Sequence, residues 1–432
     1  MEISIRNAEK NYDVIVAGGG PSGVTAAVAA ARMGAKTLVI EAGGALGGMA
    51  TLGLVSKWMP FSDRINMIYR SLAKEVIVRY KARVGIPEDK WRGLPIHPEE
   101  LKRLYDEMAE EAGVEVLFFS TVCGVQKQGD RIESVLVANK SGITAYSAKS
   151  FVDCTGDGDL ANFAGVEMEY GDKEHYVQEA SLCFCISNVH TDKRTRPIQT
   201  GREGSVWYQV LEEGKYAPLV GDHFVPTYFG NTMVVNAGCM ANVNATDPME
   251  VSRAMILGRK IADAYLRALK EYEPEMFCDA MLVATAPLLG VRESRRIVGQ
   301  YVLTAKDYFD RRSFPDEICR NSYWLDCHLP ADKIDPNGIG LGTNDCCPYE
   351  PGESHGIPFR CLVPKTVENL LVAGRCLSVD NVVLSSVRVM PNCLAEGEAA
   401  GIGAALCAKS GQAVQTLDAQ KVIARIAECD AG

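Results

Sequence analysis

The chain has 432 residues, of which 47% are hydrophobic and 23% charged, a globular composition with room for two or three domains. Its net charge of −10 argues against a general nucleic-acid binder or an anionic-membrane binder, since both use basic surfaces. No apolar run approaches the roughly 18–20 residues that span a bilayer, and residues 1–10 lack the apolar core of a signal peptide. We therefore expect a cytoplasmic protein with neither a nucleic acid nor a membrane as partner.

The first expected elements are a strand, a glycine turn, a helix and a second strand. Residues 12–17 (YDVIVA) form an apolar run typical of a buried parallel strand. Residues 21–33 are rich in alanine and favour a helix, and residues 36–40 (KTLVI) favour a second buried strand. This order predicts a strand–helix–strand unit in about thirty residues.

The turn of this unit carries the spacing G-x-G-x-x-G. Gly18 permits the tight turn, Gly20 lets the backbone approach a pyrophosphate, and Gly23 lets the helix pack close to the strand. The amides at the start of the helix and the positive end of its dipole then face that pyrophosphate. Glu41, about 20 residues beyond Gly20, ends the second strand, where its carboxylate can accept both ribose hydroxyls of an adenosine. The alternative, a glycine turn without a ligand, does not account for this context.

A second glycine-rich segment follows Glu41. Residues 42–51 (AGGALGGMAT) include Gly47 and Gly48, which let another stretch of backbone approach the phosphates. A ligand held along its length in this way suits a permanently bound FAD better than a diffusing nicotinamide. No second G-x-G-x-x-G follows a strand elsewhere in the sequence, so we expect no dedicated NAD(P)H domain.

Further strands and helices follow along the chain. Helices are expected over 98–113, 248–272 and 392–409, and strands within 114–137 (with a turn at Gly129-Asp130), over 149–154 and over 370–373. The alternation of strands and helices indicates an α/β fold.

Several of these segments carry a resemblance to known proteins. From residue 12 to residue 51 the chain resembles the FAD-dependent oxidoreductases of the two-dinucleotide-binding-domain type, which include the fumarate reductase flavoproteins. Four later segments are similar to the bacterial FAD-dependent oxidoreductase family that groups with the flavin domain of heterodisulfide reductase: 153–167 (DCTGDGDLANFAGVE), 290–304 (GVRESRRIVGQYVLT), 357–378 (IPFRCLVPKTVENLLVAGRCLS) and 386–406 (SVRVMPNCLAEGEAAGIGAAL). Residues 11–165 and 285–408 match well, and the middle matches loosely.

The resemblance implies a Rossmann-like FAD-binding domain of the glutathione-reductase type with an inserted mixed α+β substrate or cap domain. The FAD-binding domain would be discontinuous, over 1–165 and 346–432, with the cap over 166–345. FAD is expected to be non-covalent, because no histidine or cysteine lies in a recognisable linkage motif. The implied FAD contacts are Gly18, Gly20, Pro21, Ser22, Gly23, Glu41, Ala42, Gly47, Gly48, Met49, Val122, Thr155, Gly156, Gly374, Arg375, Asn392 and Leu394.

The helix expected to start near Pro391 has a role of its own in this picture. Its free amides would point towards the flavin, where reduction leaves negative charge near N1 and the C2 carbonyl. Small residues after Asn369 would admit the ribityl chain at Gly374-Arg375. Val379-Asp380-Asn381 departs from the family pattern and places polar groups near the expected flavin face.

Candidates for contact with a substrate are three arginines and one histidine. Arg292, Arg360 and Arg388 lie in the family-like segments, and in succinate/fumarate-type relatives arginines clamp carboxylates. Arginines near FAD also neutralise the pyrophosphate or pair with acids, so this alternative stays open. His328 follows a motif like the family's D-x-H and is the candidate acid/base, since the ordinary pKa of histidine lies near neutrality. A packed or surface histidine is the alternative.

The 15 cysteines indicate a reducing compartment, because an odd and scattered set of thiols would risk mispairing in a secreted chain. No Cys-x-x-Cys occurs, which excludes the usual iron–sulfur and zinc-knuckle spacings, and no metal site is predicted. Cys346-Cys347 is a vicinal pair in a Gly/Asn/Pro-rich loop that would either bind a soft metal, be redox-active or be incidental.

The favoured interpretation is an FAD-dependent oxidoreductase that transfers a hydride between flavin N5 and a small organic, anionic or polar substrate. One alternative is a flavin-containing electron-transfer subunit, which predicts ferredoxin-type cysteine runs that this chain lacks. A second is an RNA-modifying flavoenzyme, which predicts a basic surface, and a third is a protein that uses FAD only as a structural ligand. The sequence leaves open the substrate, the electron partner, the direction of the reaction and the oligomeric state.

Overall fold

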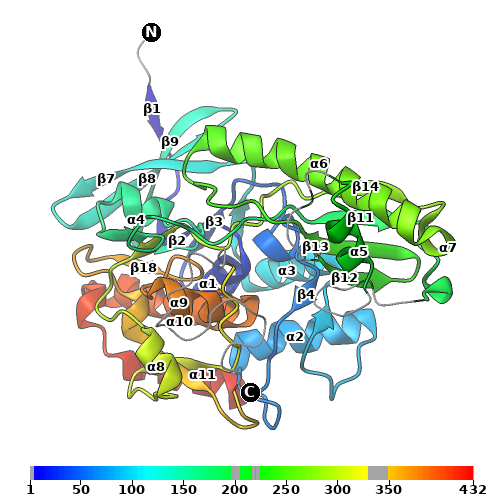
Figure 1. Ribbon diagram of the computed structural model, residues 1–432. Coiled ribbons are helices and arrows are strands. Elements are labelled where there is room, and N and C mark those ends of the chain that lie inside the picture. The colour runs from blue at the N-terminus through cyan, green and yellow to red at the C-terminus, as the bar shows by residue number, and fades with distance from the viewer. Residues whose placement is uncertain are drawn as a thin grey trace.

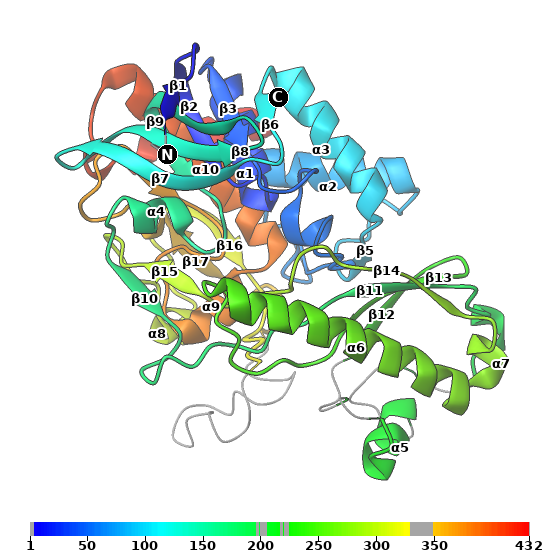
Figure 2. The same ribbon diagram turned by 90° about the horizontal axis from the view of Figure 1, so that it is seen from above.

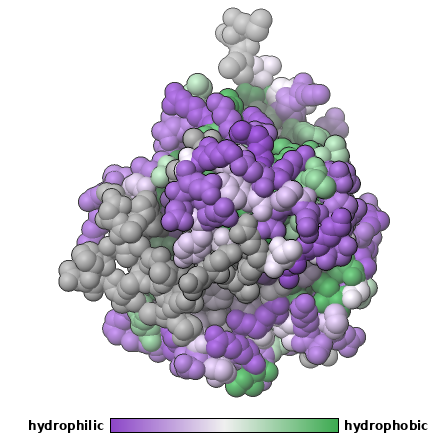
Figure 3. All heavy atoms as spheres, turned by 45° about the vertical axis from the view of Figure 1, so that its right-hand side comes forward, coloured by the Kyte–Doolittle hydropathy of each residue, from purple (hydrophilic) through white to green (hydrophobic). Residues whose placement is uncertain are grey.

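The computed structural model of the protein describes residues 4–195, 198, 205–216, 219, 224–328 and 349–431. Figures 1 and 2 show two parts side by side, one around helices α1 (Pro21–Arg32) and α10 (Met390–Ser410), the other around α6 (Pro248–Tyr272). The face in Figure 3 is mainly hydrophilic, with apolar side chains in separate small patches. None of the helices in the described part of the chain has the length and apolar character needed to cross a membrane.

An eight-stranded sheet forms the base of the first part. Its strands in spatial order are β6 (Glu115–Leu117), β3 (Thr37–Ile40), β2 (Tyr12–Ala17), β9 (Gly142–Asp153), β8 (Arg131–Asn139) and β7 (Thr121–Gln128), and both β1 (Ile5–Asn7) and β18 (Leu370–Val372) pair with β9. One region is parallel: β2 pairs with β3 and β9, β3 pairs with β6, and β18 pairs with β9. The other region is an antiparallel meander of β7, β8 and β9. The predicted α/β fold with a Rossmann-like core is confirmed.

The long strand β9 joins the two regions of this sheet. Its first half pairs with β8, and its second half pairs with β2 and β18. Sequence analysis predicts only the second half, over 149–154, because the first half (GITAYSA) is mixed in polarity and pairs at the surface. The predicted turn at Gly129-Asp130 is confirmed, since it lies between β7 and β8.

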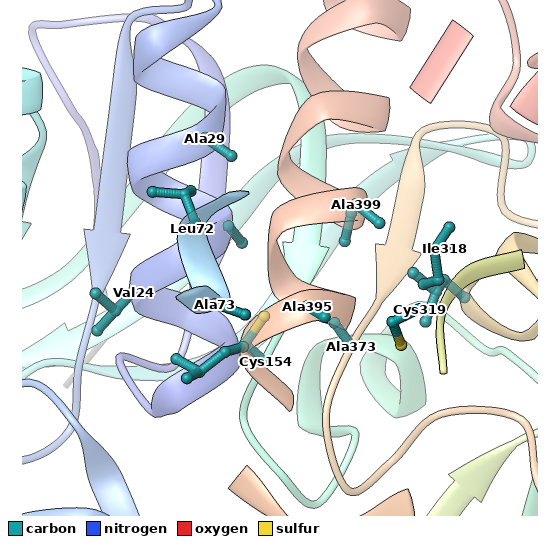
Figure 4. Close-up of a cluster of buried hydrophobic side chains, with 14 of the residues drawn as sticks. Val24, Ala29, Leu72, Ala73, Cys154, Ile318, Cys319, Ala373, Ala395 and Ala399 are labelled. Carbon is teal, nitrogen blue, oxygen red and sulfur yellow. The ribbon is translucent and has the colours of Figure 1, made fainter. Parts of the chain in front are cut away.

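Helices α1 and α10 pack against each other at unusually close range. A Cβ added to Gly397 would lie 2.0 Å from the carbonyl oxygen of Ser22, and one added to Gly401 would lie 2.1 Å from that of Ala26. The Thr25 hydroxyl donates to the Leu394 carbonyl at 2.7 Å. Figure 4 shows small side chains of both helices in this core, among them Ala29, Ala395 and Ala399. Glycine at these positions therefore brings the two predicted cofactor segments, distant in sequence, into direct contact.

Three more helices surround this pair, namely α2 (Ser71–Val84), α3 (Pro98–Ala112) and α11 (Ala419–Ala431). Helix α3 follows its prediction closely: Pro98 stands in its first turn and Gly113 ends it at φ 75°. Its expected apolar stripe is buried, at Leu101, Leu104, Tyr105 and Met108.

The second part is a four-stranded antiparallel sheet covered by α6. The strands in spatial order are β12 (Phe224–Phe229), β13 (Thr232–Ala237), β11 (Phe184–Ser187) and β14 (Met281–Thr285), with the short helices α5 (Val206–Glu213) and α7 (Pro274–Phe277) nearby. Helix α6 has the predicted bounds because Asp247 caps it, accepting from the amides of Met249 and Glu250, and Pro248 starts it. The core between sheet and helix is aromatic, with Trp207, Phe224 and Tyr265 in ring contact.

Shorter elements complete the described part of the chain. They are β4 (Lys57–Trp58), β5 (Leu94–Pro95), β10 (Met168–Tyr170), β15 (Arg295–Ile297), β16 (Glu317–Asn321), β17 (His355–Pro358), α4 (Asp159–Phe163), α8 (Ala305–Phe309), α9 (Asn381–Val387) and the short 3-10 turns η1 (Gly48–Ala50), η2 (Thr191–Lys193), η4 (Phe359–Leu362) and η5 (Val414–Thr416). Leu303, Ile318 and Leu325 pack in the core of the first part, whereas the core of the second part draws its residues from 180–289. The division into domains at 165 and 345 stays a prediction.

Candidate functional site

The turn between β2 and α1 has the geometry that a bound pyrophosphate requires. Gly18 has φ +89°, and a Cβ there would lie 2.4 Å from the carbonyl oxygen of Cys154. A Cβ on Gly23 would lie 1.8 Å from the carbonyl oxygen of Gly18. A Cβ on Gly20, in contrast, would meet nothing within 4 Å. Two glycines are thus required by the protein's own packing, and Gly20 leaves open the space at the start of the helix where a phosphate can approach.

The second glycine segment lies against this turn, as expected. The Gly47 amide donates to the Gly19 carbonyl at 2.7 Å, and a Cβ on Gly48 would lie 3.0 Å from the Cα of Gly20. Gly47 has φ +102° and Gly48 φ +47°. Ala42 precedes these glycines and Met49 follows them, in η1. Together the two segments form a cradle of backbone amides around the open side of Gly20.

The carboxylate of Glu41 lies at the end of this cradle. It is buried, with Oε2 accepting from the Gly19 amide at 2.7 Å and Oε1 accepting from the Gly43 amide at 2.6 Å. These two bonds fix the carboxylate in place, and each of its oxygens keeps a lone pair for a ribose hydroxyl. The buried Val122 of β7 follows closely on Ser120, whose amide donates to the Glu41 carbonyl at 3.1 Å. Contact of Val122 with the adenosine stays a prediction.

Two more predicted turns border the cradle. A Cβ on Gly374, which has φ +89°, would lie 2.7 Å from the Ser22 hydroxyl, so this turn touches the start of α1 beside Pro21. Arg375 donates from Nε to the Gly156 carbonyl at 3.0 Å and from Nη2 to Asp157 at 2.7 Å. The guanidinium of Arg375 therefore joins the 155–157 turn to the 374–375 turn.

Buried acids hold these turns in shape. Asp153 accepts from the amide and hydroxyl of Thr155 and from the amide of Ala161, and burial raises its pKa. Glu396 of α10 accepts from the Gly374 amide at 3.0 Å, and burial raises its pKa to about 8. The sequence alone does not reveal either role, because a carboxyl group gives no local signal that it will be buried under a backbone turn.

Buried side-chain hydrogen bonds fix the start of α10. Asn392 is fully buried, its amide nitrogen donating to Asn321 at 3.1 Å and its oxygen accepting from the Tyr69 hydroxyl. Leu394 is also buried and accepts the bond from Thr25 described above. Contact of these two residues with the flavin stays a prediction; the structure places them at the helix end expected to face it.

Three of the four candidate catalytic residues lie together around Asp326. Nε2 of His328 is 3.3 Å from Oδ1 of Asp326, and Nη2 of Arg388 is 3.1 Å from the Asp326 carbonyl and 3.9 Å from its Oδ2. Arg292 is close enough for its charge to act on the Asp326 and His328 side chains, and its Nη1 donates to the Glu179 carbonyl at 2.7 Å. These residues come from four segments, so the fold rather than the sequence brings them together.

Two buried donors in this cluster have no hydrogen-bond partner among the residues that the structure describes. They are Nε of Arg388 and Nε2 of Gln178, whose Oε1 lies 3.4 Å from Arg388 Nη2. Buried donors of this kind are rare in native proteins, because an unmade hydrogen bond costs about 1–3 kcal/mol. The cluster is therefore prepared to receive a hydrogen-bond acceptor.

The fourth candidate, Arg360, is not part of this cluster. Its guanidinium pairs with Asp316 at 2.9 Å and lies over the ring of Tyr301, with 43% of its side chain exposed. Two other arginines of the 290–304 segment are also paired, Arg296 with Glu293 at 2.6 Å and Arg295 with Asp159. Arg360, Arg296 and Arg295 therefore pair with acidic side chains, which is the alternative to contact with a substrate.

The surroundings of His328 move its pKa away from the ordinary value on which its choice as acid/base candidate rests. Burial and then the charge of Arg292 lower the pKa of His328 to about 4, against the opposing effect of Asp326. The pKa of Asp326 is itself lowered far below its ordinary value; burial raises it, but His328, Arg388 and Arg292 together outweigh burial. At neutral pH the cluster holds a neutral imidazole, an ionised carboxylate and two guanidiniums. In the sequence, Asp326 stands out only as part of the D-x-H motif that ends at His328, and no pattern marks Gln178.

The family described as "FAD dependent oxidoreductase" matches residues 13–426 of this chain. The chain belongs to that family. FAD is its cofactor, and its chemistry is oxidation–reduction on the flavin. The cradle at Gly20, the fixed carboxylate of Glu41 and the close approach of Gly48 fit this cofactor.

Similar proteins include the digeranylgeranylglycerophospholipid reductase of Picrophilus torridus, 28% identical over 235 residues that make up 49% of this chain and 56% of that one. The enzyme of the same name from Methanocaldococcus jannaschii is 26% identical over 219 residues, or 47% of this chain and 54% of that one. The match thus spans about half the length of these relatives. Among solved structures, a geranylgeranyl bacteriochlorophyll reductase-like protein from Thermoplasma acidophilum aligns over 97% of this chain and 83% of that one, with a TM-score of 0.45 and 14% identity.

In this FAD-dependent oxidoreductase, the predicted FAD contacts and the Asp326 cluster come from different segments of the chain. The predicted FAD contacts lie mainly in and beside β2, α1, η1, β18 and α10, whereas the cluster is built from the segments at 178–179, 292, 326–328 and 388. Arg388 lies between α9 and α10, directly before the helix end expected to face the flavin. This single residue therefore links the two halves of the candidate site.

Cys346-Cys347 lies outside the residues that the structure describes. The cysteines in the described part of the chain are all free thiols. Cys183 and Cys185 flank Phe184 in and beside β11, the first fully buried and the second partly exposed.

Proposed function

We propose that this enzyme uses non-covalent FAD to oxidise or reduce a small anionic organic substrate bound by Arg388 and Arg292. The observation that carries the proposal is the Asp326 cluster, with its two guanidiniums and its unpartnered donors on Arg388 and Gln178. When bound, FAD supplies the acceptor or donor of a hydride. The protein's own residues supply binding, orientation and the handling of a proton.

The positive charge of the cluster's two guanidiniums supports an anionic substrate. Among the described residues, the cluster holds two guanidiniums, one ionised carboxylate and one neutral imidazole, so cationic groups outnumber anionic ones around Asp326. A carboxylate or phosphate would add a negative charge and accept bidentate hydrogen bonds from Arg388. Arg292 is 7% exposed, and its pKa is lowered first by burial and then by Arg388, as expected for two neighbouring buried cations.

His328 is the proposed proton acceptor. Its Nε2 lies against the Asp326 carboxylate at 3.3 Å, which favours the tautomer with the proton on Nε2 and makes Nδ1 the basic nitrogen. A neutral imidazole can take a proton from a substrate hydroxyl or carbon acid; its lowered pKa makes it a weaker base than an ordinary histidine and favours release of the proton afterwards. Asp326 then positions the ring rather than accepting the proton itself.

The test is a titration of the FAD-loaded enzyme, followed by the flavin absorbance spectrum. Benzoate, succinate and glycerol 1-phosphate are compared with the uncharged benzamide, succinamide and glycerol; the phosphate is included because relatives are named for a glycerophospholipid. We expect at least one anion to perturb the spectrum while its uncharged partner does not. Arg388→Gln should weaken that binding by more than about 30-fold, since truncating one partner of a buried charge pair costs about 2–5 kcal/mol.

The matched control is Arg267→Gln, on the exposed face of α6, which should bind the anion as the wild type does. Equal affinity for the anion and its uncharged partner, or an Arg388→Gln variant with unchanged affinity, would remove the anionic substrate from the proposal and leave the FAD assignment in place.

The proposal also covers the relationship of the chain to another flavin domain and its location in the cell. We infer a kinship with the flavin domain of heterodisulfide reductase from the four long motifs of the sequence. We also infer a cytoplasmic location from the 15 cysteines.

A further inference from the structure

A mixed group of metal-ligand side chains lies at the outer end of the cap, where α7 meets β14. His190 follows β11, and Cys278 and Asp279 lie between α7 and β14. Their ligand atoms all lie within 4.8 Å of one another, and Nε2 of His190 is 3.1 Å from Oδ2 of Asp279. Within the described part of the chain, no other set of three or more histidine, cysteine, aspartate and glutamate side chains has this spacing.

The backbone fixes these three residues relative to one another. The His190 amide donates to the Met276 carbonyl at 2.9 Å, and the Cys278 amide donates to the Pro274 carbonyl at 2.9 Å. Strands β11 and β14, which lead to the two segments, are paired through Ser187 and Met281. The ligands therefore converge because of the sheet register and the α7 turn, before any metal is present.

The donor set is one that zinc prefers. An imidazole nitrogen, a thiolate sulfur and a carboxylate oxygen are its three common protein ligands, and a water completes the tetrahedron. One thiolate and one carboxylate balance the charge of a divalent cation, so the filled site would be neutral. The side chains of His190 and Asp279 are 37% and 70% exposed, which leaves room for the metal to enter and for the water.

We propose that His190, Cys278 and Asp279 bind one thiophilic divalent cation, represented by Zn²⁺, with water as the fourth ligand. Binding converts the Cys278 thiol to a thiolate bonded to the metal and releases its proton to solvent. The metal joins the segment after β11 to the α7–β14 turn, and so cross-links the end of the cap.

This site is separate from the flavin chemistry. In Figures 1 and 2, α7 lies at the end of the cap away from α1 and α10. The proposal therefore stands or falls independently of the proposed substrate, and the metal is expected to stabilise the cap rather than to take part in the reaction.

The experiment measures zinc binding by the full-length, FAD-loaded protein. The protein is stripped with a chelator, dialysed against a zinc buffer, and its zinc content is determined by mass spectrometry. We expect one zinc per chain. Loss of an outer hydrogen-bond partner of a metal ligand already costs about 10–100-fold in affinity, so Cys278→Ser and His190→Gln should each weaken binding by more than about 100-fold. Cys123→Ser and Cys429→Ser, at two other exposed cysteines, should not change it.

FAD content per chain shows whether each variant is folded. If Cys278→Ser fails to fold, Asp279→Asn replaces it, because that exposed side chain can change with little effect on packing. The proposal is overturned if the wild type binds no zinc, or if Cys278→Ser retains it. It is also overturned if zinc is lost in a Cys346→Ser/Cys347→Ser double variant and kept in Cys278→Ser.

Discussion

Replacing Glu396 by glutamine should make the protein more stable at high pH and leave it nearly unchanged at low pH. Glu396 is fully buried in α10, one carboxyl oxygen accepting from the Gly374 amide at 3.0 Å and the other, Oε1, without a hydrogen-bond partner among the described residues. Burial raises the pKa of this carboxyl to about 8, so the folded protein keeps it protonated at neutral pH. Glutamine keeps the acceptor for Gly374 and has nothing to ionise.

The magnitude follows from the two pKa values. Below an ordinary pKa of 4.5 the group is protonated in both states and contributes nothing. Between 4.5 and about 8 the unfolded chain loses the proton while the folded protein retains it, so the free energy of unfolding falls as pH rises. At about 1.4 kcal/mol per pH unit, the loss in the wild type reaches about 5 kcal/mol above pH 8. Glu396→Gln lacks this loss.

The assay is urea unfolding at pH 5, 6.5 and 8 with saturating FAD, followed by tryptophan fluorescence. The stability difference between Glu396→Gln and the wild type should shift in favour of the variant by about 4 kcal/mol from pH 5 to pH 8. Glu398, whose pKa burial raises to about 7, titrates in both proteins and cancels from the difference.

Glu133→Gln, at an exposed position of β8, is the matched control and should follow the wild type at every pH. Curves for Glu396→Gln and the wild type that stay parallel from pH 5 to pH 8 would refute the reasoning, because they would mean that Glu396 is ionised in the folded protein.

Three further outcomes are expected. Gly20→Val should fold but lose its flavin, because a side chain there enters the open space at the phosphate turn without touching protein; flavin absorbance per chain after gel filtration checks this, and wild-type stoichiometry would place the phosphate elsewhere. Acid precipitation should leave the yellow colour in the supernatant, whereas colour in the pellet would indicate a covalent bond. His355 is neutral in the folded state because burial lowers its pKa to about 3, so the contribution of His355 to the free energy of unfolding should fall by about 1.4 kcal/mol per pH unit as pH drops from 6.5 towards 3. His355→Gln should lack that part of the slope in urea unfolding at pH 7 and pH 4.5, and equal slopes would contradict it.

The cofactor half of the site is predictable because its chemistry is local. The tight turn at Gly18, the approach at Gly20 and the strand–helix contact at Gly23 each depend on a few neighbouring atoms, so the spacing alone indicates them. The bounds of α6 are predictable for the same reason, since Pro248 and the capping Asp247 are adjacent in sequence.

The substrate half depends on contacts that no local pattern encodes. His328 carries an ordinary sequence motif, but its lowered pKa comes from burial and from Arg292, a residue of another segment. Arg360 lies in a segment as family-like as that of Arg388, yet Asp316 takes up its charge. His190 and Asp279 are likewise distant in sequence, and only the pairing of β11 with β14 brings them together.

A crystal structure of the enzyme with FAD and an anion from the titration tests the central claim most directly. The account predicts the pyrophosphate at Gly20, the start of α10 facing the flavin ring, and the anion bound by Arg388 beside that ring. Guanidiniums of Arg388 and Arg292 that both lie more than about 10 Å from the flavin ring would contradict it, since that distance exceeds the reach of a direct contact or of one bridging water.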